Sequence, residues 1–140
     1  MRVNQDKLRQ KLQFMRNQLR ALKKFQEMDI DQFMSDEIYE AAATRMLQVA
    51  VESMLDICAH VVSREGWGLP KTYVEAVELV VRNDLLPSNT EGTFKAMARF
   101  RNRVVHLYDD VDANEIWEII QNRLPDFKTF MASVIDRYLT

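Results

Sequence analysis

The segment from Glu37 to about Arg64 constrains the fold most, because it is apolar on almost every side. Its apolar positions include Ile38, Ala42, Leu47, Ala50, Val51, Leu55, Ile57 and Val61. A helix that is hydrophobic all round has to be covered by neighbouring elements on several sides. Gly66 and Gly68 follow this run and predict where it ends. The segment therefore predicts the central helix of a helical bundle.

A second long helix is predicted ahead of the central one, from about Asn4 to Met28. Its apolar residues recur at spacings of four and three, which places them on one face of a helix. They are Leu8, Leu12, Met15, Leu19, Leu22 and Phe25. The segment from Asp29 to Asp36 interrupts this pattern, so we expect a connection there.

Two helices are predicted after the central one from their capping signals. Thr72, followed three residues later by Glu75, has the pattern of a capping box and opens a short helix. The next helix is expected to begin near Asn89 or Thr90 and to end around Tyr108, where acidic residues follow.

The last helix is predicted to begin after Asp112, with Glu115 in its first turn. Pro125 is expected to kink this helix, because its ring removes one hydrogen bond of the helical ladder. Five helices without a strand pattern predict an all-α, five-helix bundle with long antiparallel helices. At 140 residues the chain fits one domain, spanning residues 1–140.

Charge and composition exclude several classes of protein. Nineteen Lys and Arg face 21 Asp and Glu, so the net charge of -2 gives no global attraction to nucleic acid or membrane. We expect no membrane segment, because no apolar run reaches the roughly 18 residues that a spanning helix needs. The single cysteine, Cys58, is interpreted as a buried thiol. We therefore expect a soluble, cytoplasmic protein.

Polar residues interrupt the central helix at regular intervals. Arg45, Gln48, Glu52, Asp56 and His60 step by three or four, so they fall on one narrow strip of an otherwise apolar cylinder. Polar groups that leave water need hydrogen-bond partners. For Glu52 and Asp56 we expect either an ion pair within the helix or to another helix, with a residue such as Arg45, or a role in a functional site. We expect His60 to be a core residue.

The chemically densest segment is Arg99-Phe100-Arg101-Asn102-Arg103-Val104-Val105-His106-Leu107-Tyr108. Arginine offers a planar fork of donors that matches phosphate oxygens, and histidine titrates near neutral pH. Together they are able to hold a phosphodiester and to move a proton, which is the outline of ribonuclease chemistry. Residues of these types near a helix end are also common as caps, core residues or salt bridges.

Helical geometry complicates the catalytic interpretation. At about 100° per residue, the side chains of Arg101 and His106 leave a helix about 140° apart, whereas Asn102 and His106 share one face. Two arrangements would bring them together: the helix ends near His106, or a two-fold dimer places Arg101 and His106 of two chains around one cleft. We favour the dimer.

The run from Arg101 to Tyr108 resembles the Arg-x4-His-x-Tyr motif of HepT toxins, a branch of the HEPN ribonucleases. The polar central helix, from Arg45 to His60, resembles the long helix that lies ahead of this motif in the family. The order and length of the helices agree over nearly the whole chain, from about Val3 to Leu139.

The resemblance implies a metal-independent endoribonuclease toxin that acts as a homodimer or higher even oligomer, without a cofactor. Its catalytic pair would be Arg101 and His106. Asn102 and one acidic residue, Glu52 or Asp56, would support this pair. In the same helix, Arg99 and Arg103 are predicted to contact RNA; no DNA substrate is expected.

The resemblance also implies a partner. HepT proteins are neutralised by MntA, a minimal nucleotidyltransferase that uses ATP to attach AMP units to the motif tyrosine, which corresponds to Tyr108 here. Phosphate added beside Arg101 would engage its guanidinium and block the RNA backbone. The alternative is a non-catalytic dimeric HEPN module that binds or regulates a nucleotidyltransferase, consistent with the acidic pI of about 5.7.

Overall fold

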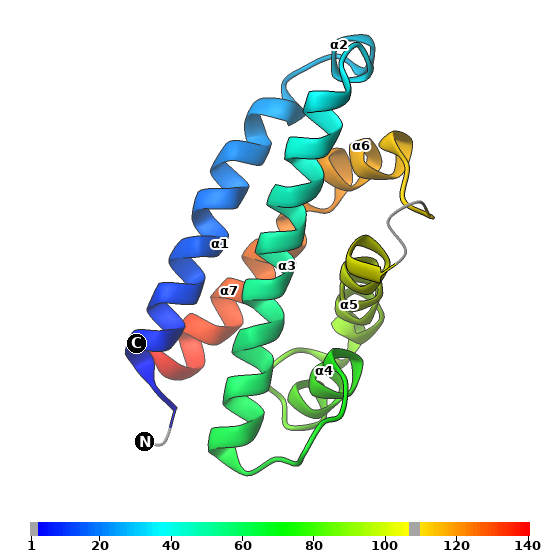
Figure 1. The fold of residues 1–140 in the computed structure, drawn as a ribbon. Helices are drawn as coiled ribbons and strands as arrows, with labels where there is room; N and C mark the ends of the chain where they lie inside the picture. The colour runs from blue at the N-terminus through cyan, green and yellow to red at the C-terminus, as the bar shows by residue number, and fades with distance from the viewer. Residues whose placement is uncertain (1–2, 107–109) are drawn as a thin grey trace.

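The computed structural model describes residues 3–106 and 110–140 (Figure 1). Within these residues the chain forms α-helices and one short 3-10 turn, and it contains no strand. The elements are α1 (Gln5–Gln26), α2 (Ile30–Met34), α3 (Glu37–Glu65), α4 (Tyr73–Arg82), η1 (Ser88–Thr90), α5 (Glu91–His106), α6 (Ala113–Asn122) and α7 (Leu124–Tyr138). The all-α prediction is confirmed.

Helix α3 occupies the centre of the bundle, as its apolar surface predicted. Figure 1 shows α1 running antiparallel beside it on one side, with α4 and α5 on the other. Helix α7 packs behind them, and α2 lies at the end where α1 turns into α3. Of the polar residues that step along α3, Arg45 is exposed, Gln48, Glu52 and Asp56 are half-buried, and His60 is buried.

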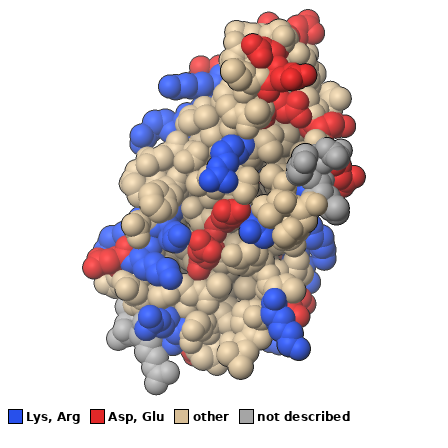
Figure 2. Space-filling model, viewed as in Figure 1, with Lys and Arg blue, Asp and Glu red and all other residues tan. Residues whose placement is uncertain are grey.

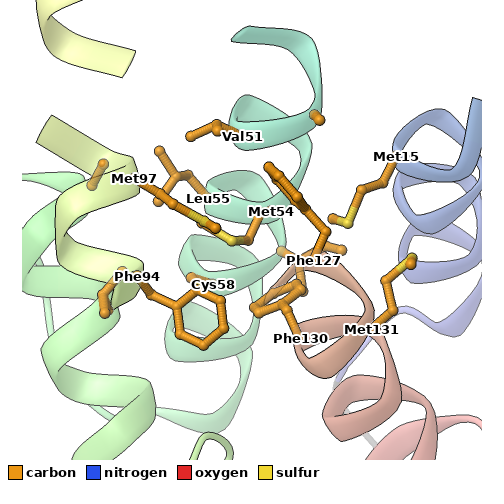
Figure 3. Packing of buried hydrophobic residues seen from close by; sticks show 14 of the residues in the cluster. Met15, Val51, Met54, Leu55, Cys58, Phe94, Met97, Phe127, Phe130 and Met131 are labelled. Carbon is orange, nitrogen blue, oxygen red and sulfur yellow. The ribbon is translucent and has the colours of Figure 1, made fainter. Parts of the chain in front are cut away.

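The core is built where α3 meets α5, α7 and α1 (Figure 3). Met54 and Cys58 of α3 face Phe94 of α5 and Phe130 of α7, whose ring centroids lie 5.8 Å apart in an edge-to-face arrangement. Cys58 is buried and free, as predicted, and burial raises the pKa of its thiol to about 12.

The helix ends follow the capping signals of the sequence. Thr72 accepts a hydrogen bond from the backbone N–H of Glu75 at 3.1 Å, and Asp112 accepts one from that of Glu115 at 2.9 Å. Gly66 closes α3 in the left-handed conformation, with a φ of 71°. These caps confirm the predicted start of α4, the predicted start of the helix after Asp112 and the predicted end of the central helix.

The predicted number of helices and the predicted kink are corrected by the structure. The interrupted segment contains α2, whose N-terminus is capped by Asp29 and which buries Phe33. The predicted last helix is two helices that separate at Arg123. Pro125 lies in the first turn of α7, where a missing N–H costs no helical hydrogen bond. It therefore starts a new helix and does not bend an old one.

Helix α3 is also, among the described residues, the one helix whose length and composition would suit a membrane span. Its 18-residue window has a mean hydropathy of 1.3, and 61% of that window is buried inside the fold. A central core helix meets the same criterion, so this feature is weak evidence for a membrane segment.

Candidate active site on helices α3, α4 and α5

Helix α5 carries the motif and is helical through His106. Arg101 and Asn102 are half-buried, whereas His106 is exposed at the C-terminal end of the helix. Because the helix does not unwind between them, the side chains of Arg101 and His106 leave it about 140° apart. The dimeric arrangement of the two residues therefore stays a prediction.

The guanidinium of Arg101 is held by three neighbours. Its Nε donates to Oε1 of Glu52 at 3.3 Å, and its terminal nitrogen donates to Oδ1 of Asn102 at 3.3 Å. Its Cζ lies 5.3 Å from the centre of the Tyr73 ring, within the range of a cation–π contact. Gln48 donates to the same oxygen of Glu52 at 3.0 Å. The side chains of Arg101 and Glu52 keep 21% and 31% of their exposure, so this ion pair is partly shielded from water.

Asp56 lies one helical turn from Glu52 and has different partners. Its carboxylate accepts from Nζ of Lys11 on α1 at 3.0 Å and, more weakly, from the hydroxyl of Tyr73 at 3.4 Å. Burial and the Asp56 carboxylate raise the pKa of Tyr73, so its hydroxyl stays protonated and donates. The partners of the acidic strip are thus Arg101 and Lys11, and not Arg45, which is exposed.

Figure 2 shows acidic and basic atoms side by side at the centre of the face over α3. The Arg101–Glu52 and Lys11–Asp56 ion pairs join α3 to α5 and to α1. The predicted polar strip is therefore confirmed to have partners, drawn from α1, α4 and α5.

The other arginines of α5 differ in their surroundings. Arg103 forms two parallel hydrogen bonds with the carboxylate of Glu115 on α6, one of them 2.8 Å long, and lies 3.8 Å from Asp110. Arg99 is exposed. The predicted RNA contact of Arg103 competes with this ion pair, whereas Arg99 has no such competition among the described ion pairs.

The predictions for His60 and Tyr108 remain to be compared with the structure. His60 is buried, and its Nε2 accepts a hydrogen bond from the backbone N–H of Asn4 at 3.0 Å, which confirms it as a core residue. Tyr108, the predicted AMP acceptor, lies outside the described residues. In residues 3–106 and 110–140, no group of three or more His, Cys, Asp and Glu side chains is arranged to hold a metal ion.

The sequence profile of the ribonuclease HepT-like family matches residues 15–134, which is most of the chain. The chain belongs to the ribonuclease HepT-like family. This membership confirms the predicted family and the predicted class of enzyme, a ribonuclease.

Two curated relatives of this HepT-like chain are named as nucleases. It is 25% identical over 130 residues to a tRNA nuclease HepT from Aphanizomenon flos-aquae, an alignment that covers 93% of this chain and 88% of that protein. It is 26% identical over 114 residues to an mRNA nuclease HepT from Shewanella oneidensis, with 80% of this chain and 86% of that protein covered. The two relatives differ in the RNA named.

The fold is shared with a solved HEPN toxin. The structure of a tri-AMPylated Shewanella oneidensis HEPN toxin in complex with an MNT antitoxin superimposes with a TM-score of 0.86. The alignment covers 94% of this HepT-like chain and 98% of that chain, at 22% identity. This likeness confirms the HEPN-type bundle.

Sequence reasoning missed two residues of the HepT-like site, Tyr73 and Lys11. Thr72 marks Tyr73 as the first residue of a helix, and this signal was available. Nothing in the sequence indicates that this first turn faces Arg101, because that contact depends on how α4 crosses α3.

Proposed function

We propose that this protein is a metal-independent RNA endonuclease, the toxin of a toxin–antitoxin pair, that acts in the cytoplasm. Arg101 binds the scissile phosphate, and His106 transfers the proton. The nuclease names of the curated relatives support this activity. Their different RNA names leave the substrate of this chain as RNA in general.

The anchoring of Arg101 is the observation that carries the proposal. A guanidinium has five N–H donors, and Glu52 and Asn102 accept from two of them. Three N–H groups on the terminal nitrogens remain, which is enough for a planar, bidentate contact with phosphate oxygens. Arg101 is thus a preorganised cation beside an exposed face of the bundle.

The proposed reaction needs no external nucleophile. The 2′-hydroxyl of the RNA attacks the adjacent phosphorus as His106 removes its proton, and the bond to the 5′-oxygen breaks as that oxygen takes a proton from water. His106 then releases its proton to solvent. The products are a 2′,3′-cyclic phosphate and a free 5′-hydroxyl. Arg101 stabilises the charge that develops on the phosphorane oxygens. DNA lacks the 2′-hydroxyl and is not cleaved by this route.

The angle between Arg101 and His106 supports a cleft shared by two copies of the chain. One chain presents the two side chains about 140° apart on α5, which is poor geometry for two groups acting on one phosphate. In a two-fold dimer, Arg101 of one chain and His106 of the other meet across the axis. Asn102 and Arg99 lie on the side of α5 toward His106 and support RNA binding there.

An MntA-like minimal nucleotidyltransferase is proposed as the antitoxin, with Tyr108 as the acceptor of AMP. The similar fold of a tri-AMPylated HEPN toxin bound to its MNT antitoxin supports this pairing. Each added phosphate carries negative charge to the region of Arg101, where it competes with the RNA backbone. Modification therefore inhibits the nuclease by occupying its phosphate site.

RNA cleavage in EDTA tests the proposed activity. Protein shown by mass to be free of AMP should produce cyclic phosphate ends, and His106→Ala and Arg101→Ala should each lose at least about a hundredfold in rate. Arg137→Ala is the matched control, because Arg137 is an exposed arginine at another part of the bundle. Cleavage that requires added metal, or that survives in His106→Ala, would contradict the mechanism.

A non-catalytic HEPN module that binds a nucleotidyltransferase is the second candidate. The pairing of Arg101 with Glu52 and of Arg103 with Glu115 favours it, since both guanidinium charges are already balanced. Such a module would cleave no RNA and would keep its affinity for the nucleotidyltransferase after His106→Ala. Binding and cleavage measured on the same variant separate the two functions.

A further inference from the structure

Tyr73 links the two ion pairs of the candidate site. It is the first residue of α4, so its position is fixed by the Thr72 cap and by the packing of α4 on α3. Its ring lies against the guanidinium of Arg101, with 5.3 Å between Cζ and the ring centre, and its hydroxyl points to Asp56. Tyr73 lies outside the Arg-x4-His-x-Tyr motif, which therefore assigns it no role.

We propose that Tyr73 is a positioning residue for Arg101, and that Asp56 and Lys11 act on the site only through Tyr73. This inference rests on the proposed function for its effect on catalysis. The two carboxylates then have different roles. Glu52 orients Arg101 by direct contact, whereas Asp56 orients the tyrosine that supports Arg101.

The geometry explains why Glu52 alone does not fix the guanidinium. Glu52 accepts only from Nε and Asn102 only from one terminal nitrogen, both at 3.3 Å, so these two neighbours hold the guanidinium by long contacts. The Tyr73 ring adds a third contact, because a cation–π attraction favours a guanidinium close to the ring face. Catalytic groups need placement within about 0.5 Å, and two long hydrogen bonds alone hold the guanidinium less tightly than that.

The two parts of Tyr73 are expected to contribute unequally. The ring lies at good distance from Arg101, whereas the bond between its hydroxyl and Asp56, at 3.4 Å, is long and weak. Lys11 and Asp56, at 3.0 Å, form the stronger pair and hold the carboxylate near the hydroxyl. Loss of the ring should therefore affect cleavage more than loss of the hydroxyl.

The experiment compares Tyr73→Phe with Tyr73→Leu in the metal-free RNA cleavage assay. Tyr73→Phe keeps the ring and should retain kcat within about threefold, whereas Tyr73→Leu should lose about 5- to 30-fold in kcat with less than about a twofold change in KM. Trp67→Leu is the matched control, because Arg137 lies at the same 5.3 Å from the Trp67 ring outside the site. This control should keep kcat.

A second readout does not depend on cleavage. In nuclear magnetic resonance, the Nε–H signal of Arg101, assigned by its loss in Arg101→Lys, should be ordered in the wild type and in Tyr73→Phe. It should become mobile in Tyr73→Leu. If Tyr73→Leu fails to fold, Tyr73→Met, which keeps a long apolar side chain without a ring, takes its place in both measurements.

The outcomes separate this inference from the proposed function. If the wild type cleaves RNA and the ringless variant keeps both kcat and an ordered Arg101 signal, the positioning role is overturned. An equal loss in Tyr73→Phe and Tyr73→Leu would overturn the assignment to the ring. If the wild type cleaves no RNA, the proposed function fails, and the Arg101 signal alone decides whether Tyr73 positions the guanidinium.

Discussion

His60 shows how a buried imidazole is tied to the start of the chain. Its Nε2 accepts the backbone N–H of Asn4, the residue that caps α1, so this contact requires the neutral ring. Burial lowers the pKa of His60 below its usual value, and the positive charges of Lys7 and Arg64 lower it further. Protonation would break the bond and leave a charge in a buried place.

This histidine predicts a loss of stability in mild acid. In the unfolded chain His60 binds a proton near pH 6.5, whereas in the folded chain it binds one only at lower pH. The contribution of the neutral His60 to the free energy of unfolding is therefore complete above about pH 6.5. It is lost as the pH falls through the lower, folded pKa. The melting temperature of the wild type should therefore fall more steeply below pH 6.5 than that of His60→Gln, whose amide oxygen accepts the same bond without titrating.

The control for this prediction is His106→Gln, which makes the same change at the exposed end of α5. Comparison of its melting curves with those of the wild type shows what a His-to-Gln change outside the buried position does by itself. Parallel curves for the wild type and His60→Gln between pH 7.5 and pH 5 would show that the buried imidazole does not contribute.

The sequence predicts several residues of the candidate site, but it does not predict which of them contact each other. The spacing of Glu52 and Asp56 on α3 places both on one strip, so the sequence left open which of them meets Arg101. Their separation along α3 is one turn, and the choice is made by where α5 and α4 cross that helix. Such crossings depend on the packing of the whole bundle, which side-chain spacing does not specify.

At the scale of elements, one glycine follows the C-terminus of α3 and another lies at the N-terminus of α5, and substitution by alanine should change the stability of the fold in opposite directions at the two positions. Gly66 closes α3 with a φ of 71°, whereas Gly92 lies in the first turn of α5 without positive φ. An added Cβ at either position meets no atom within 4 Å, so the difference between them is one of backbone conformation. These positions isolate the cost of the left-handed cap.

Gly66→Ala should destabilise the fold by about 1 kcal/mol, because an alanine in the left-handed region is strained. Gly92→Ala should stabilise it by about 0.5 kcal/mol, because alanine loses less backbone freedom in a helix. Denaturant unfolding of both variants measures the two shifts. If both substitutions changed the free energy of unfolding in the same direction, this account of the α3 cap would be contradicted.

Element types followed from the sequence more closely than element boundaries did. The 3.6-residue period and the caps of Thr72 and Asp112 predicted the main helices, because these signals are local. The predicted kink at Pro125 is wrong, because a proline in a helical pattern fits both a bend and a first turn, and Pro125 lies in the first turn of α7. The choice depends on Arg123, two residues before Pro125, which is the C-cap of α6.

At the scale of the whole molecule, the site is assembled from four helices on one face of the bundle. Helix α1 supplies Lys11, α3 the two carboxylates, α4 Tyr73 and α5 Arg101. His106 leaves α5 in another direction, so the bundle presents its two catalytic candidates on different sides of one helix. A working nuclease therefore requires a second copy of the chain in the proposed mechanism.

Mixing two inactive variants tests this requirement. If Arg101 and His106 act across a two-fold axis, a mixed dimer of Arg101→Ala and His106→Ala contains one intact site, formed by Arg101 of one chain and His106 of the other. When equal amounts of the two variants exchange subunits at random, about half of the dimers are mixed, and one of the two sites in each mixed dimer is intact. The mixture should therefore recover about a quarter of the wild-type rate.

The same mixture gives no recovery if each chain carries its own complete site, because every chain then lacks one member of the pair. Exchange of subunits has to be verified by mass in the mixed sample, and the mixture of Arg101→Ala with Arg101→Ala,His106→Ala serves as the control without any intact site. Recovery in the first mixture alone would assign the two residues to opposite chains. Verified exchange without recovery would overturn the shared cleft and return both residues to one chain.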